Sequence, residues 1–227
     1  TALDQIVRQG KALYVGISNY QAEDASKAAK ILKELGTPCL IHQPRYNMMD
    51  RWVENGLLDV LENEGVGAIA FSPLKQGILT NKYLNGFPED SRAVKDARYL
   101  QTSQLDEATI STVKQLNEIA ISRNQTLAQM AIAWLLKDKR ITSVLVGASK
   151  PAQLLDSIKA LDNLAFNAET LNKIETIFFI ISFCITYITC YPFTIITFIY
   201  NSISMSNSAI ATGSATFWNK TLNTTTT

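Results

Sequence analysis

The chain has 227 residues and a formal net charge of +1, from 21 basic residues, 20 acidic residues and one neutral histidine. All charged side chains except Lys220 lie in residues 1–175, where the two signs are mixed as in a soluble globular domain. The balanced charge and the lack of a Lys/Arg cluster do not favour nucleic acid as a partner.

Cysteine and histidine give no sign of a metal centre. The three cysteines, Cys39, Cys184 and Cys190, form no CxxC pair, and His42 is the only histidine. We therefore predict neither a zinc site nor a disulfide framework, no metal ligands, and a reducing, cytoplasmic location.

Short apolar strands alternate with helices along residues 1–175. In chain order the patterns predict a helix at 1–10, a strand at 14–17, a helix at 22–36, a strand at 39–47, a helix at 52–65, a strand at 66–74, helices at 108–123 and 126–138, a strand at 141–149 and a helix at 151–161. Strands that alternate with helices of this length indicate a parallel sheet with helical crossovers.

Two architectures fit this alternation, a doubly wound open sheet and a (β/α)8 barrel. No GxGxxG follows any predicted strand, and polar residues end all four strands, as on the active face of a barrel. A whole barrel has eight strands, and here the first helix has no strand before it. We therefore predict an α/β fold that is the C-terminal half of a (β/α)8 TIM barrel, with four βα units.

Five ordered motifs carry a family resemblance. They are GKALYVGISNY (10–20), IHQPRYN (41–47), AIAFSPLKQGILTNKYL (68–84), PEDSRA (88–93) and SVLVGASKPAQLLDSI (143–158). Together they resemble the C-terminal half of the aldo-keto reductases over about residues 1–175, in the branch of the bacterial glyceraldehyde-phosphate reductases and the β-subunits of voltage-gated potassium channels. The resemblance implies an oxidoreductase that uses NADP(H) to reduce an aldehyde or ketone to an alcohol by hydride transfer.

The strand ends supply the residues that would hold the nicotinamide. A hydroxyl or amide side chain can donate to and accept from a carboxamide, and by resemblance Ser18, Asn19 and Gln43 have this role. Phe71 offers an aromatic face on which the nicotinamide ring can stack. Without the resemblance, Ser18 and Asn19 would be read as a helix N-cap and Gln43 as a buried amide with its hydrogen bonds satisfied.

Two later segments would hold the phosphates and the adenosine. By resemblance the loop after the third strand wraps the pyrophosphate, with Ser72, Leu74, Gln76, Gly77, Lys82 and Arg92. After the fourth strand, Gly147 allows a close approach of the backbone, and Ser149 can cap the helix beside exposed N–H groups, which makes an anion site. The resemblance places Ser149 and Gln153 at the adenosine end with its 2′-phosphate, and Asp156 and Ser157 near the adenine; an ordinary capped surface helix is the alternative for the last two.

The catalytic set of the family is missing from this sequence. Its tyrosine, lysine, aspartate and histidine lie on the first four strands, so we assign no catalytic residue and expect this chain alone to be inactive. A small carbonyl substrate would need the missing half, and a homo-oligomer is compatible with the sequence. The alternatives are a non-catalytic NADP-binding or channel-associated β-subunit-like protein, and an inactive gene fragment.

The end of the chain does not belong to the resemblance. We divide the chain into a truncated barrel at 1–176, a hydrophobic segment at 177–200 and a low-complexity tail, expected to be disordered, at 201–227. The middle segment is uncharged and long enough to cross a bilayer, but it contains Pro192 and has no flanking basic cluster. It is either a membrane anchor or a non-native extension of the chain.

Overall fold

The computed structural model describes residues 2–84 and 106–190, with side chains described as far as Phe179. The chain divides into two compact units, Thr1–Phe178 and Phe179–Thr227, and the first unit contains the sheet. The predicted cofactor residue Arg92, the end of the hydrophobic segment from 191 to 200 and the tail at 201–227 lie outside the described residues.

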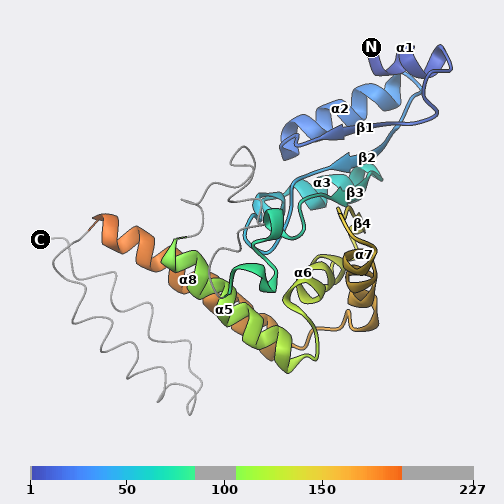
Figure 1. Cartoon of the computed structure of the whole chain (residues 1–227). Coiled ribbons are helices and arrows are strands. Elements are labelled where there is room, and N and C mark those ends of the chain that lie inside the picture. Colours follow the sequence, from blue (N-terminus) through green and yellow to red (C-terminus); the bar gives the residue numbers. More distant parts are fainter. Residues whose placement is uncertain (1, 85–105, 191–227) are drawn as a thin grey trace, which may run out of the picture. The chain divides into compact units, whose positions relative to one another are not determined.

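The first unit follows the predicted alternation of helices and strands (Figure 1). In chain order its elements are α1 (Ala2–Arg8), β1 (Val15–Ser18), α2 (Ala22–Glu34), β2 (Cys39–Gln43), the 3-10 turn η1 (Trp52–Glu54), α3 (Leu57–Glu64), β3 (Gly67–Ala70), the 3-10 turns η2 (Lys75–Gly77) and η3 (Asn81–Tyr83), α5 (Glu107–Ser122), α6 (Leu127–Leu136), β4 (Ile141–Val144), α7 (Pro151–Ile158), η5 (Lys159–Asp162) and α8 (Ala168–Cys190). Strands β2, β3 and β4 end earlier than predicted, whereas β1 has the predicted length and is shifted by one residue.

The four strands form one parallel sheet in the order β1-β2-β3-β4. Helices join each strand to the next, as parallel pairing requires. Because all the strands run in the same direction, their carboxyl ends lie along one edge of the sheet. This is the predicted α/β arrangement, and it is consistent with part of a TIM barrel.

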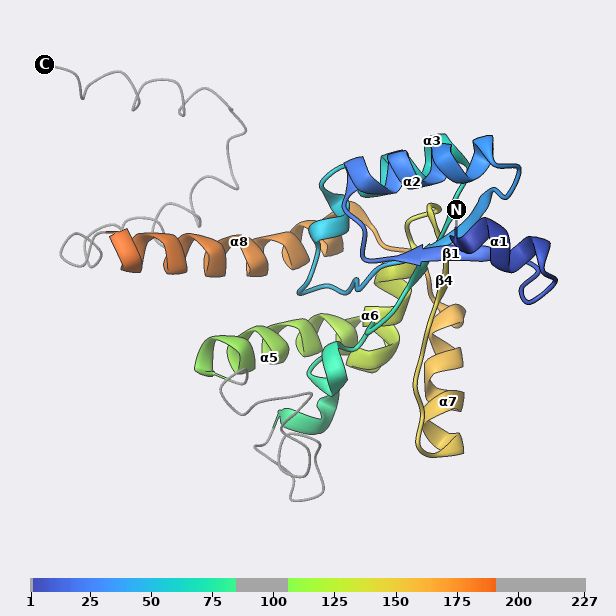
Figure 2. The same cartoon turned by 90° about the horizontal axis from the view of Figure 1, so that it is seen from above.

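Helices cover one face of the sheet more fully than the other. His42 and Ala68 pair across β2 and β3, and both are 0% exposed. Ile41 and Gly67, the preceding pair in the same register, are only half-buried. Helix α2 contacts β2 and α3, and α3 contacts β3, so these two helices lie side by side on the buried face (Figure 2).

Strands β1 and β2 approach each other closely at Gly16. A Cβ atom on Gly16 would lie 2.7 Å from Cγ1 and 2.8 Å from the carbonyl oxygen of Ile41. Because one of these atoms belongs to the backbone of the paired strand, a larger residue would displace the strand itself. The absence of a side chain therefore allows the two strands to pair here, beside a register shift between Val15 and Gly16.

Tyr46 and Arg51 of a polar network contact Trp134 of α6, the largest of the fully buried side chains. The ring of Tyr46 packs on Trp134 with a centroid distance of 5.6 Å, and the Tyr46 hydroxyl donates to Glu54 at 2.7 Å. Burial, with the adjacent Glu54 carboxylate, raises the pKa of Tyr46 far above its ordinary value, so the phenol stays neutral. Arg51 pairs with Glu54 at 2.8 Å and with Glu175 of α8 at 2.7 Å, which ties α8 to this core.

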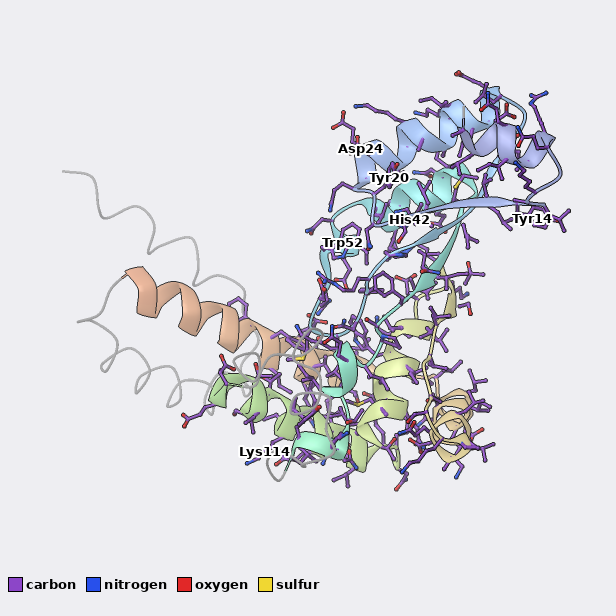
Figure 3. All side chains as sticks on the ribbon, turned by 45° about the horizontal axis from the view of Figure 1, so that its top comes forward. Tyr14, Tyr20, Asp24, His42, Trp52 and Lys114 are labelled. Carbon is purple, nitrogen blue, oxygen red and sulfur yellow. The ribbon has the colours of Figure 1, made fainter. Side chains whose placement is uncertain are left out.

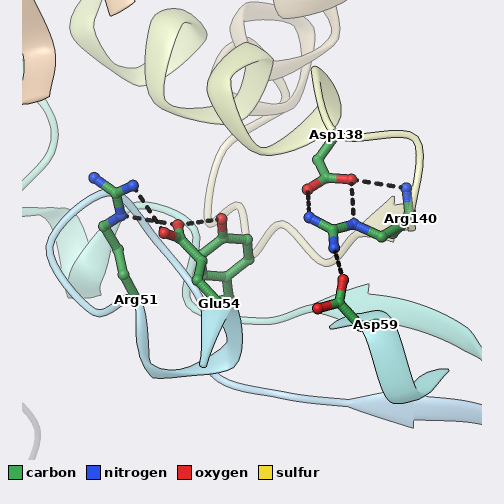
Figure 4. A network of polar contacts seen from close by, with 6 residues as sticks. Arg51, Glu54, Asp59, Asp138 and Arg140 are labelled. Atoms are coloured by element: carbon green, nitrogen blue, oxygen red, sulfur yellow. Dashed lines mark hydrogen bonds and ion pairs between the residues drawn. The ribbon is translucent and has the colours of Figure 1, made fainter. Parts of the chain in front are cut away.

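A second network joins the start of β4 to α3 (Figure 4). Arg140 pairs with Asp138 at 2.7 Å and also with Asp59. The hydrogen bond from Arg140 is the main cause that lowers the pKa of Asp138. These ion pairs fix the amino end of β4, opposite the edge where the predicted site residues lie.

Helix α7 leaves apolar side chains uncovered. Leu154, Leu155 and Ile158 are 45%, 62% and 51% exposed. Helix α7 follows β4, which pairs with one strand only in the described sheet, as expected for an open part of a barrel.

Helix α8 carries the chain from the first unit into the second. Ile174 and Ile177 are 0% and 7% exposed, and the first unit ends at Phe178, two residues after the boundary that we expected. Among the described helices, none combines the length and the apolar character that crossing a membrane requires.

Candidate functional site

Residues at the carboxyl ends of β1 and β2 are joined directly. The Ser18 hydroxyl donates to the backbone oxygen of Gln43 at 2.7 Å, and the backbone N–H of Arg45 donates to Oδ1 of Asn19 at 2.9 Å. Neither Ser18 nor Asn19 caps α2, whose N-cap is Gln21 without a side-chain hydrogen bond. The Ser-Asn pair therefore connects two strand ends.

Asn19 has a backbone conformation that few residues adopt. Its φ is 58°, in the left-handed region, which Asn tolerates better than most residues other than Gly. Such a conformation persists only when the surrounding contacts determine it, and it occurs often at binding sites. Ser72 at the end of β3 has a similar φ of 56°, so two of the four strand ends share this feature.

The amide groups at this edge retain hydrogen-bonding capacity. In the part of the chain that the structure describes, neither Nδ2 of Asn19 nor the side-chain amide of Gln43 has a hydrogen-bond partner. Asn19 is exposed and Gln43 is half-buried, so neither belongs to the core. The remaining donor of Asn19 and the donor and acceptor of Gln43 fit the carboxamide of a nicotinamide ring, which needs both donors and acceptors.

The end of β3 is joined to the loop after β2. The backbone N–H of Phe71 donates to the oxygen of Pro44 at 3.0 Å, and the N–H of Tyr46 donates to the oxygen of Phe71 at 3.2 Å. Nδ2 of Asn47 donates to the oxygen of Ser72 at 3.1 Å. The half-buried ring of Phe71 is thus carried on backbone that is fixed on both sides, as a stacking surface requires.

The loop after β3 turns sharply through Lys75, Gln76 and Gly77, whose φ values are 44°, 58° and 98°. Leu74 and Gly77 are half-buried and Gln76 is exposed. Lys82 is also exposed and has no ion-pair partner among the described residues. Within the turn the N–H groups of Lys75 and Gly77 donate to the oxygens of Ser72 and Leu74. The exposed ammonium group of Lys82 is therefore the part of this loop that best fits the phosphate role that the resemblance implies.

The segment after β4 is organised around Gln153. Its Oε1 accepts hydrogen bonds from the Ser149 N–H at 2.8 Å, the Ser149 hydroxyl at 3.1 Å and the Lys150 N–H at 3.3 Å. The N-cap of α7 is Lys150, not Ser149 as the sequence suggested. Gly147, Ser149 and Gln153 are all exposed, so an anion could reach this turn.

Asp156 and Ser157 have partners within the protein. Nε2 of Gln129 donates to Oδ1 of Asp156 at 2.6 Å, and the Thr126 hydroxyl donates to Oδ2 at 3.3 Å. The Ser157 hydroxyl donates to the backbone oxygen of Gln153 at 2.9 Å. Asp156 thus links α7 to the start of α6, and it also borders a polar cavity of about 580 Å³.

A larger hollow, of about 910 Å³, lies away from the predicted residues. It is lined by residues around the amino end of β4, among them Lys137, Asp138 and Arg140, and by Phe166. None of the predicted cofactor residues lines it. Volume alone would therefore point to the opposite end of the sheet from the strand-end residues that the sequence singles out.

Sequence reasoning missed three residues that shape the site. His42 contacts the backbone of Tyr20, the Arg45 backbone holds Asn19, and Asn47 holds Ser72. Their only sequence signal is that they lie within or beside the IHQPRYN motif. The groups that they contact are distant in sequence, so pattern alone could not identify their roles.

Comparison with known proteins agrees with this geometry. Residues 1–178 match the aldo/keto reductase family. The chain is 53% identical over 179 residues to the L-glyceraldehyde 3-phosphate reductase of Escherichia coli O157:H7, which covers 77% of this chain and 52% of that protein. It is 36% identical over 183 residues to a putative voltage-gated potassium channel subunit beta of Schizosaccharomyces pombe, which covers 78% of this chain and 53% of that protein.

The chain thus spans about half the length of these curated relatives. The family match covers the whole parallel sheet and all of its described strand ends. The chain belongs to the aldo/keto reductase family.

Proposed function

We propose that this chain provides the cofactor-binding half of an NADP(H)-dependent carbonyl reductase. The observation that carries the proposal is the carboxyl edge of the sheet, where Nδ2 of Asn19 and the side-chain amide of Gln43 have no hydrogen-bond partner among the described residues and the backbone of Phe71 is fixed by the loop after β2. Membership of the aldo/keto reductase family supports the same reading.

The residues of this edge would bind and orient the nicotinamide. Asn19 and Gln43 pair with its carboxamide, and the Phe71 ring lies against one face of it, which fixes the face that is presented to a substrate. The cofactor, when bound, supplies the hydride that reduces the carbonyl. Every group named here binds or positions, and none of them transfers a proton.

The other half of the cofactor would lie between η2 and α7. The turn at Gln76 and Gly77 approaches the pyrophosphate, and the Lys82 ammonium neutralises part of its charge. The Ser149 hydroxyl donates to the 2′-phosphate at the exposed start of α7, which gives a preference for NADPH over NADH. Arg92 belongs to this proposal by resemblance.

The substrate class comes from the relatives. Identity is 53% and 51% to two L-glyceraldehyde 3-phosphate reductases and 34% to 36% to potassium channel β-subunits. The difference favours a reductase of a small aldehyde over a channel subunit. The proton donor would come from the half of the barrel that this chain does not match.

A fusion tests the proposal. Residues 1–178 are joined behind the first half of the Escherichia coli reductase, so that the catalytic set is restored. We expect loss of NADPH absorbance that depends on both the fusion and a small aldehyde, and no such loss with the 227-residue chain alone. A folded fusion that binds no NADPH would overturn the proposal.

A further inference from the structure

His42, the only histidine of the chain, is completely buried on β2 directly before Gln43. It takes no part in the proposed binding chemistry. We infer that His42 is a positioning residue that holds the Ser18–Tyr20 turn in the conformation that presents Asn19 to the nicotinamide carboxamide. The inference rests on the proposed function, because it assigns a task to a residue behind that site.

The contact that supports this inference joins the imidazole to the backbone of Tyr20. Nε2 of His42 lies 3.1 Å from the backbone nitrogen and 3.1 Å from the backbone oxygen of Tyr20. His42 pairs with Ile17 in the sheet, three residues before Tyr20, and Figure 3 shows His42 and Tyr20 in the same part of the molecule. The imidazole therefore holds the residue that directly follows Asn19.

Either neutral tautomer can hold the loop. With its proton on Nδ1, the ring accepts the Tyr20 N–H at Nε2; with its proton on Nε2, the ring donates to the Tyr20 oxygen. Nδ1 is buried and has no partner among the described residues. Burial removes water from the charged imidazole and is the main cause that lowers the pKa of His42, so the neutral ring is favoured.

Three successive residues of the turn are thus fixed from the neighbouring strand. The Ser18 hydroxyl binds the Gln43 oxygen, Oδ1 of Asn19 binds the Arg45 N–H, and Tyr20 binds His42. This arrangement explains how Asn19 keeps a φ of 58° while its Nδ2 stays free. Of the three contacts, only the one from His42 comes from a side chain that the ligand would not touch.

The alternative is that His42 only fills space beneath the loop. An apolar side chain of similar size would fill that space without holding Tyr20, whereas an amide would restore the hydrogen bond. His42→Leu and His42→Gln therefore separate the two roles. Cys39→Ala, a truncation at a buried position of the same strand, is the control for a general loss of stability.

The experiment compares the full-length variants in two measurements. Hydrogen exchange reports on the Tyr20 amide without any ligand, and fluorescence titration reports on NADPH affinity. Loss of one hydrogen bond corresponds to about a tenfold change, so we expect His42→Leu to raise both the exchange rate and the Kd by about that factor. We expect His42→Gln to recover most of each effect and Cys39→Ala to show neither.

Equal behaviour of His42→Leu and Cys39→Ala in both measurements would overturn the inference. Failure of the Gln variant to recover either property, when it is as stable as the Leu variant, would do the same. If the wild-type chain binds no NADPH, the proposed function fails and the ligand-related part of the inference fails with it. Faster Tyr20 exchange in His42→Leu would still establish that His42 holds the loop.

Discussion

The carboxyl ends of β1, β2 and β3 differ from the turn at 149–153, which follows β4, in how they are held. At the first three ends the hydrogen bonds connect residues of different strands, such as Ser18 with Gln43 and Phe71 with Pro44. After β4 the bonds of the Ser149–Gln153 turn stay within five consecutive residues. One half of the candidate site is therefore built by the sheet, and the other is a local turn.

The difference predicts how each half responds to substitution. A change at a strand end that is tied to its neighbour must disturb the sheet, the loop and the site together. A change in the turn after β4 affects only the start of α7. Substitutions at the strand ends should therefore lower the free energy of unfolding more than substitutions in the turn after β4, even if one cofactor binds to both halves.

The largest expected effect comes from closing the space between β1 and β2. Gly16→Ala would place a Cβ within 2.8 Å of the Ile41 oxygen, and overpacking of this kind typically costs about 1–3 kcal/mol of unfolding free energy. Urea denaturation measures it. Gly147→Ala is the matched control, because a Cβ there meets nothing within 4 Å. Equal stability of the two variants would contradict the proposed constraint at Gly16.

Asn19→Ala tests the strained strand end. The variant keeps a φ that disfavours alanine by about 1–2 kcal/mol, and it leaves the Arg45 N–H without its acceptor. We expect the free energy of unfolding, measured by heat or urea, to fall by that amount. Asn19→Asp keeps the acceptor for the Arg45 N–H, so its unfolding free energy should fall by less. An Ala variant as stable as the wild type would show that the contact with Arg45 does not fix this turn.

His42 gives the β1–β2 end a pH dependence that the β4 turn lacks. Burial is the main cause of its lowered pKa, whereas an unfolded histidine titrates near pH 6.5. As the pH falls below about 6.5, the unfolded chain binds a proton that the folded chain does not, so the unfolding free energy decreases. Because the chain has one histidine, His42→Gln should flatten this part of the curve. Identical pH profiles would contradict the prediction.

The smallest effect is expected at Gln153. Gln153→Ala removes the acceptor for Ser149 and Lys150 at an exposed helix start, where such contacts are worth about 0.5–1 kcal/mol. Tyr20 hydrogen exchange should not change. A larger decrease in unfolding free energy, or faster hydrogen exchange at the Tyr20 amide, would mean that the two halves of the site are coupled within the protein.

The pattern of apolar residues was enough to predict the strands, their order of appearance and the parallel sheet. It also predicted that polar residues such as Ser18, Asn19 and Gln43 follow the strands. The links between strand ends could not be predicted, because they depend on register and on backbone groups such as the Arg45 N–H. His42 was missed for the same reason: in sequence it is a polar residue in an apolar strand, and its task appears only beside Tyr20.

The helix after β4 shows that local features could be predicted from the sequence, whereas contacts with distant segments could not. The motif around Ser149 correctly indicated the start of a helix, but the N-cap is Lys150 rather than Ser149. It did not reveal that the Asp156 carboxylate accepts hydrogen bonds from Gln129 and Thr126, which lie about 30 residues earlier in the chain. For Asp156 the structural alternative thus has direct support, whereas its proposed contact with adenine has none.

The most direct test of the proposed site is a titration of the full chain with NADPH and with NADH. Phe71→Ala removes the stacking surface for the nicotinamide ring that both cofactors share. It should therefore weaken the binding of both cofactors by a similar factor, corresponding to about 1 kcal/mol of binding free energy. Ser149→Ala should weaken NADPH more than NADH, because only NADPH carries the 2′-phosphate. Equal losses for the two cofactors at Ser149, or unchanged affinity at Phe71, would contradict the assignment of a dinucleotide site to this edge of the sheet.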